Sequence, residues 1–445
     1  MQTPTLSWTR GRALRSLVAT CALGLALGAA PADAQDSFQD LVANLKSPTV
    51  RTRLDATRRL GESRRHEAVA PISALVRDPE PRVRLAMVRA LSALRDVSGV
   101  PALVTALEDG DATVRDEAIS AIVEIYAERT RTGPVNRFLE LFSDEFPRSS
   151  VPPFTAVDPS VFRGLSRALG DEEKGVRADA AFAIGILGGG SSIPDLVRAL
   201  QDPEAQVRAA AATALGKSAT AVEGRELIPL LADSNANVRD RALQSIGMLR
   251  VREAAPALRE MFEQNRRRDL GARALAALAR TADPAQDDLY RELLVSRDVE
   301  HRRLAVEGMA RIADPSMMPA FKVDFQRERN ADVRMAYAFG IVRLGDHAFL
   351  DSLALPLGGS GLAAGRARDL LLELGPDVAP GLYKYLSDRD AGVRGAVAEL
   401  LADLGDTNAL PKLEPLLADP NSRVADRANR AIQRLRGKEP GERAP

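Results

Sequence analysis

Residues 193–216 read IPDLVRALQDPEAQVRAAAATALG and contain two short apolar stripes separated by a turn. The apolar residues recur at helical spacing, first as Ile193, Leu196, Val197 and Leu200, then as Val207, Ala211, Ala214 and Leu215. Between the stripes, Asp202 can accept the free amides of a second helix, and Pro203 fits the first position of that helix. The stretch therefore predicts a helical hairpin.

The hairpin recurs along the chain, mostly at intervals of 31 or 32 residues or twice that distance. The Val-Arg pair that opens the second helix has its arginine at Arg84, Arg115, Arg177, Arg208, Arg239, Arg334 and Arg394. Each repeat-length interval of the chain is called a slot. Weaker copies of the Val-Arg pair occupy the other slots, at Thr52-Arg53, Leu270-Gly271, His301-Arg302, Ala363-Ala364 and Val424-Ala425. Because one helix pair cannot bury its own apolar face, such a period predicts a stacked solenoid.

The repeated pattern resembles the short HEAT repeats of the phycobilisome-lyase-like class, over about residues 37–436. This resemblance implies an all-α, armadillo-like fold, a right-handed α-α superhelix of about eleven or twelve hairpins. The class includes enzymes, inhibitors and scaffolds, so the resemblance predicts the fold and not an activity. Tetratricopeptide and ankyrin arrays have similar periods, but their Trp/Tyr and Thr-Pro-Leu-His markers are missing from this sequence.

The first 34 residues have the pattern of a secretory signal peptide. Arg10, Arg12 and Arg15 precede an apolar run from residue 16 to residue 30, and a small-x-small site ends at Ala34. The alternative is an uncleaved anchor, although the run is shorter than the roughly 20 residues of a spanning helix. Cleavage removes Cys21, the single cysteine, and suits a chain kept in an oxidising compartment. We therefore expect an exported protein, periplasmic or extracellular.

Charge composition bears on the class of partner. The chain has 61 basic and 61 acidic residues, so it lacks the net positive field with which proteins hold nucleic acid or anionic membranes. The arginine-rich stretch around residues 266–268 is interleaved with Glu263 and Asp269. We expect no nucleic-acid partner, and no stable membrane insertion after signal cleavage.

One slot of the array, residues 131–160, keeps the repeat length but loses the repeat pattern. Its prolines forbid a regular second helix, and phenylalanines gather there in a chain built mainly from Ala, Leu and Val. Either a projecting loop offers aromatic anchors to a partner, or the rings fold back and plug the gap left by the missing helix. The candidate anchors are Phe138, Phe142, Phe146 and Phe154.

The slot divides the chain into a signal peptide at residues 1–34, N-terminal repeats at 35–130, the irregular insertion at 131–160 and the main array at 161–436. An irregular turn is expected near residues 358–365, where Gly358, Gly359 and Gly361 weaken helix preference. Residues 437–445 are expected to form a disordered tail.

An aspartate stands six residues before the arginine position of most repeats. We interpret the pair as structural, because an arginine just inside the second helix can reach the Asp of its own or of the adjacent turn through charge-assisted hydrogen bonds. The predicted ladder consists of Asp78, Arg84, Asp109, Arg115, Asp171, Arg177, Asp202, Arg208, Asp233, Arg239, Asp388 and Arg394.

No motif for catalysis or for cofactor binding is recognised. His66, His301 and His347 are far apart in the sequence, and one His-Glu pair at residues 66–67 cannot supply a di-iron site of the kind found in a HEAT-repeat hydroxylase. Neither a phosphate loop nor a serine elbow is present. We expect no metal and no cofactor.

The function that follows is a non-catalytic exported scaffold that binds a protein or peptide on its concave side. Second helices are expected to line that side and to present exposed candidates for partner binding, Arg89, Glu124, Gln244 and Arg343. The alternative is a HEAT-based enzyme, lyase-like or a metal-dependent hydroxylase or oxidoreductase, with an unrecognised site.

Overall fold

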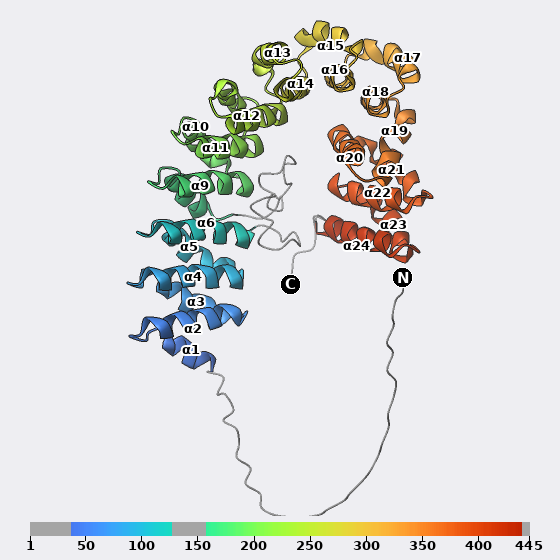
Figure 1. Ribbon diagram of the computed structural model, residues 1–445. Coiled ribbons are helices and arrows are strands. Elements are labelled where there is room, and N and C mark those ends of the chain that lie inside the picture. Colours follow the sequence, from blue (N-terminus) through green and yellow to red (C-terminus); the bar gives the residue numbers. More distant parts are fainter. Residues whose placement is uncertain (1–36, 127–156, 438–445) are drawn as a thin grey trace, which may run out of the picture.

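The computed structural model describes residues 37–126 and 157–437, and every regular element within these ranges is a helix. The helices stack into an open arc, in which the first and last hairpins form two arms (Figure 1). The predicted all-α solenoid is confirmed. The signal peptide, the tail after residue 437 and the candidates Phe138, Phe142, Phe146 and Phe154 lie outside the described residues and stay predictions.

The described residues form twelve hairpins. The first helices are α1 (Phe38–Asn44), α3 (Val69–Ser73), α5 (Val100–Ala106), α8 (Pro159–Ala168), α10 (Ile193–Ala199), the 3-10 helix η5 (Glu223–Ala232), α13 (Ala255–Gln264), α15 (Asp287–Leu294), α17 (Met318–Arg327), α19 (Asp351–Ala354), α21 (Ala379–Leu382) and α23 (Leu410–Leu413). The second helices are α2 (Val50–Glu62), α4 (Pro81–Leu94), α6 (Ala112–Tyr126), α9 (Lys174–Leu187), α11 (Ala205–Ser218), α12 (Ala236–Leu249), α14 (Asp269–Thr281), α16 (Val299–Ile312), α18 (Ala331–Arg343), α20 (Leu362–Leu374), α22 (Ala391–Asp403) and α24 (Ser422–Arg436).

The apolar core is a seam shared between neighbouring hairpins. Buried residues form one cluster that runs from Leu41 to Leu435. Where the arc is most curved, α13, α15 and α17 lie on its outer rim and α14, α16 and α18 on its inner side (Figure 1). Each hairpin therefore covers the apolar face of the next one, as expected for a repeat array.

The hairpin of residues 193–216 has the two helices predicted for it, but its second helix begins later than expected. The N-cap of α11 is Glu204, not Asp202, and Pro203 precedes the helix. The reason is that the Asp202 carboxylate accepts the backbone N–H of Glu204 at 2.9 Å. Asp202 thus shapes the turn between the two helices, and α11 starts at Ala205.

The stack continues across the slot at residues 131–160. α6 packs directly on α9, and Arg115 of α6 pairs with Asp171 at the turn before α9. The N–H of Asp158 donates to the Tyr126 hydroxyl at 3.4 Å, so Tyr126 and Asp158, at the two edges of the described ranges, lie together. The two interpretations of this slot, a projecting loop or a plug, fall on residues outside the described ranges and stay predictions, while the helices on either side of the slot pack directly on each other.

Glycines occupy a turn and a close helix contact. Gly361 has φ of 91° and caps α20, a backbone conformation that favours glycine. Gly216 of α11 faces α12, and a Cβ built on it would lie 2.4 Å from the Ser245 hydroxyl and 3.1 Å from the Ser245 Cα. The Ala-Leu-Gly that ends this repeat is therefore explained by the close approach of successive second helices.

We predict that Gly216→Ala lowers the free energy of unfolding by about 1–3 kcal/mol, because the added methyl group overpacks the contact between α11 and α12. Thermal melting followed by circular dichroism measures the change. Gly175→Ala is the matched control, since nothing lies within 4 Å of a Cβ at that position of α9. Equal melting temperatures for the two variants would contradict this explanation of Gly216.

Candidate binding surface

The repeated arginine joins its own turn to the following repeat. Nε and Nη2 of Arg208 donate to the Asp233 carboxylate at 2.7 and 2.9 Å. Its Nη1 donates to the backbone carbonyl oxygens of Asp202 and Pro203 at 2.8 and 2.9 Å. One guanidinium therefore binds the turn that precedes it and the carboxylate that lies 25 residues after it.

The same inter-repeat bridge occurs in both arms of the arc. The other pairs are Arg53–Asp78, Arg84–Asp109, Arg115–Asp171, Arg177–Asp202 and Arg394–Asp419, with Arg302–Glu328 as a glutamate version. Arg53 was not among the predicted members, because Thr52 replaces the valine that marks the other copies. We refer to these bridges as the ladder.

Two predicted members, Arg239 and Asp388, do not complete a bridge. Nη1 of Arg239 binds only the carbonyl oxygens of Asp233 and Ser234, at 2.7 and 3.0 Å, and the residue 25 positions later is Gln264. The residue 25 positions before Asp388 is Ala363. Among the described residues the ladder is therefore broken between α12 and α22, except at Arg302–Glu328.

The ladder changes the titration of its carboxylates. The hydrogen bond from Arg208 holds the pKa of Asp233 below its usual value, against the opposing effect of desolvation. A group with a lowered folded-state pKa contributes stability above its unfolded pKa, and this contribution is lost as the pH falls through the folded one. The bridge at Asp233 is therefore expected to weaken below about pH 4.

A second set of side chains lies nine residues after the ladder position of each second helix. In five successive helices, from α11 to α18, this set consists of Lys217, Met248, Arg280, Arg311 and Arg343, which we call the inner row. In the next two second helices the equivalent residues are Glu373 and Asp403. The row is thus cationic along the curved part of the arc and acidic after it.

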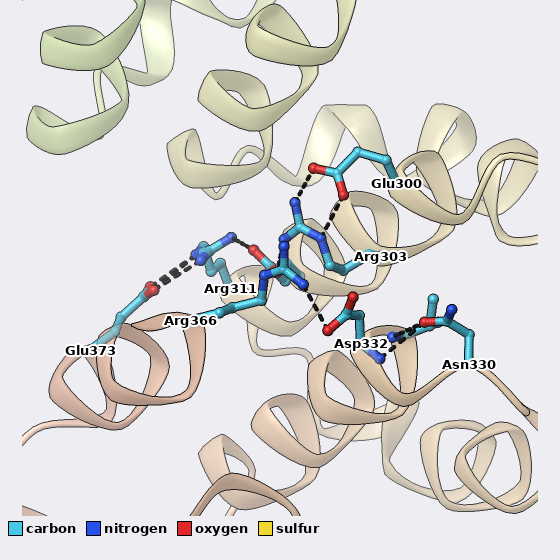
Figure 2. A network of polar contacts seen from close by, with 9 residues as sticks. Glu300, Arg303, Arg311, Asn330, Asp332, Arg366 and Glu373 are labelled. Carbon is cyan, nitrogen blue, oxygen red and sulfur yellow. Dashed lines mark hydrogen bonds and ion pairs between the residues drawn. The ribbon is translucent and has the colours of Figure 1, made fainter. Parts of the chain in front are cut away.

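Contacts across the arc place Arg311 of this row on its inner side. Arg311 of α16 binds Glu373 of α20 through Nε and Nη2, each at 2.9 Å (Figure 2). Arg250, which caps α12, donates to the same carboxylate at 2.9 Å. Residues that are 62 and 123 positions apart therefore meet, which is possible only where the second helices converge.

The buried part of this surface is a chain of paired charges. Arg303 binds Glu300 and Glu307 (Figure 2 shows the first pair), and Arg311 also binds Glu307, at 3.2 Å. Desolvation opposes the charge of Arg311, yet Glu307 and Glu373 raise its pKa above the ordinary value. Arg303, Glu307 and Arg311 are all buried, so each needs its partner.

Two arginines of the inner row have no ion pair among the described residues. Arg280 is exposed as a residue; partial desolvation of its guanidinium, then the neighbouring Arg311, lowers its pKa, while Glu307, Glu373 and Asp369 oppose that shift. Arg343 is half-buried; its Nε is buried without a hydrogen-bond partner, and its guanidinium lies 5.9 Å from the centre of the Phe339 ring. Desolvation also lowers the pKa of Arg343.

Three of the four predicted surface candidates on second helices are more buried than expected. Arg89 alone is fully exposed, and it pairs with Glu117 at 3.2 Å. Glu124, Gln244 and Arg343 are half-buried. Glu124 accepts a hydrogen bond from Ser92, and Gln244 accepts one from Arg241 at 3.2 Å. The difference arises because successive second helices converge, so that side chains on their facing surfaces cover one another.

The arginine-rich stretch around residues 266–268 and two of the histidines considered as metal ligands make ordinary side-chain contacts. Arg266 pairs with Glu292 at 2.6 Å and lies over the Phe262 ring. His66 contacts Asp96, and His301 packs edge-on against Phe262. Within residues 37–126 and 157–437, no group of three or more His, Cys, Asp or Glu side chains could hold a metal ion. Nor does any helix in those ranges have the length and apolar character needed to cross a membrane.

An acidic pair lies between α6 and α9. Desolvation, and then hydrogen bonding to Asp116, raises the pKa of Asp179 to about 8. Both carboxyl groups are half-buried. Asp179 is therefore expected to hold a proton at neutral pH, when its unfolded form is ionised.

Comparison with known proteins finds three regions that match a family of repeats. Residues 38–123, 162–223 and 363–433 match the family model of HEAT repeats, whereas no curated protein matches the chain. The crystal structure of an engineered protein is 19% identical, with a TM-score of 0.36 over 90% of this chain and 98% of its own. The Escherichia coli protein YibA is also 19% identical, with a TM-score of 0.40 over 61% of this chain and 91% of its own.

We predict that Arg208→Ala lowers the free energy of unfolding by about 3 kcal/mol, because it leaves the largely buried Asp233 carboxylate without its partner. Arg239→Ala is the matched control and should cost about 1 kcal/mol, since Arg239 binds carbonyl oxygens alone. Denaturant melts at pH 7 measure both values. Equal losses would show that the inter-repeat carboxylate contributes nothing.

Asp179→Asn should change the pH dependence of stability. A carboxyl group whose folded pKa is raised to about 8 makes the wild-type protein less stable as the pH rises from about 4 to 8. The variant lacks this titration and should exceed the wild type by about 2 kcal/mol at pH 9, after allowance for solvent screening. Melting temperatures of the variant and the wild type between pH 5 and 9 measure this difference. The control is Asp377→Asn, at an exposed position. Parallel pH profiles for Asp179→Asn and the wild type would refute the raised pKa.

Proposed function

We propose that this all-α solenoid of HEAT repeats is an exported, non-catalytic scaffold that binds a protein or peptide partner on its inner side. The observation that carries the proposal is the inner row. The row is a strip of equivalent positions on successive second helices, from Lys217 to Arg343, and second helices line the inner side where the arc bends (Figure 1). Such a strip suits an extended partner that contacts several repeats at once.

The chemistry of the inner side also supports binding. Arg280 and Met248 are exposed, while Phe339 and Arg311, which is paired with Glu373, are buried. Arginine and methionine are enriched at protein interfaces, where the guanidinium can donate several hydrogen bonds and the thioether adapts to varied shapes. Export is supported by the predicted signal peptide, residues 1–34.

The experiment is site-specific photo-crosslinking in cells. A photoreactive phenylalanine derivative replaces Arg89 or Gln244 on second helices, and Arg198 or Val323 on first helices provides the control. We expect one protein to be captured from the envelope fraction by both inner positions and by neither outer position. Capture only from outer positions, or only from the cytoplasmic fraction, would contradict the proposal.

A further inference from the structure

We propose that the inner row between α11 and α18 is a docking surface for an acidic, extended polypeptide segment. This inference rests on the proposed scaffold function and gives its partner a chemistry. The row offers Lys217, Arg280, Arg311 and Arg343 with one apolar member, Met248. Glu373 follows at once on α20 and marks the end of the cationic part.

The charge balance of the curved part supports an anionic partner. Arg250, Arg280, Arg303, Arg311 and Arg343 share this region with Glu300, Glu307 and Glu373, so arginines exceed glutamates by two. Asp369 also faces Arg280 and reduces the excess to one. The whole chain is neutral, so the positive excess is a local property of this surface.

The distribution of ion pairs shows where an anion would bind. The glutamates are already bound, Glu307 and Glu373 by Arg311, and Glu300 by Arg303. Arg280 is exposed and Arg343 is half-buried, with its Nε buried without a hydrogen-bond partner, and neither forms an ion pair in the described residues. Desolvating a charge without pairing it is unfavourable, so a partner carboxylate would compensate for the partial burial of Arg343, and a second one would pair with the exposed Arg280.

The geometry suits an extended chain. Arg280 and Arg343 lie on α14 and α18, with α16 between them, and packed helix axes are about 8–10 Å apart. An extended polypeptide advances about 3.3 Å per residue. Arg311 between them is buried and already paired, so acidic residues roughly five or six positions apart on a strand crossing the row would meet Arg280 and Arg343. A planar guanidinium can bind a carboxylate through two parallel hydrogen bonds.

The probe for the test is a fluorescein-labelled twelve-residue peptide that alternates glutamate and alanine, titrated with the full chain and followed by fluorescence anisotropy. The control probes are the same peptide with glutamine for glutamate and a twelve-nucleotide single-stranded DNA. We expect the acidic peptide to bind, its affinity to fall with added salt, and both control probes to bind at least tenfold more weakly.

The variant that tests the site carries Arg280→Met and Arg343→Met. We expect its dissociation constant for the acidic peptide to rise at least tenfold while its melting temperature stays at or above that of the wild type, because two uncompensated charges are removed. The control carries Arg297→Met and Arg329→Met, which remove the same charge from exposed turns, and its affinity should stay within twofold. If the methionine pair impairs folding, Arg280→Lys with Arg343→Lys keeps the charge and should retain salt-dependent binding.

Several results would overturn the proposal. These are equal affinity for the glutamine peptide, tighter binding of the DNA, unchanged affinity in the methionine pair, or no binding of the acidic peptide at low salt. A dimer of the chain that the methionine pair abolishes would assign the surface to a second copy. If crosslinks from Arg89 and Gln244 still capture a partner when Arg280 and Arg343 are replaced, the scaffold function stands and the acidic partner alone is refuted.

Discussion

Each ladder arginine satisfies two demands with one side chain. Its Nη1 completes the hydrogen bonds of its own turn, and its other nitrogens hold the carboxylate of the next repeat, as Arg208 does with Asp202 and Asp233. A hairpin with one apolar face cannot be stable alone, so its position must be set by a neighbour. The bridge fixes that position at the turns, while the shared apolar seam provides most of the stabilisation by burial.

The ladder and the curvature of the arc are related. Bridges are continuous from Arg53 to Asp233, through the arm formed by α2 to α12, and most are missing where α14 to α18 bend (Figure 1). In the bend, the carboxylate of Glu373 accepts hydrogen bonds from Arg250 and Arg311, which connects α12, α16 and α20 directly. The long-range charge pairs of the inner side thus take over where the local bridges end.

The periodicity of the sequence is sufficient to predict the fold, but it does not predict which side chains form the candidate binding surface. The recurrence of Asp and Val-Arg predicts hairpins, because each copy is decided by neighbouring residues. It does not tell which aspartate an arginine binds, since the preceding and the following Asp both recur at fixed offsets. The half-burial of Gln244 and Arg343, and the meeting of Arg250 with Glu373, depend on the curvature of the whole array. No local pattern encodes that curvature.

The slot at residues 131–160 illustrates the same limit. The sequence predicts an interruption of the array there, whereas Arg115 of α6 pairs with Asp171 at the turn before α9, a contact that the length of the slot does not reveal. The inner row has a detectable signal, because Arg280, Arg311 and Arg343 recur nine residues after the ladder position. This recurrence can be recognised as a surface feature only after the structure shows which side of the second helices faces the inside of the arc.

The central claim is that repeats are held in register by arginine–aspartate bridges between neighbours. A double-mutant cycle on Arg208→Ala and Asp233→Ala tests it most directly, because the coupling energy isolates this pair from the other contacts of each residue. The bridge predicts a coupling energy of about 2 kcal/mol or more at pH 7. A coupling energy indistinguishable from zero would contradict the account.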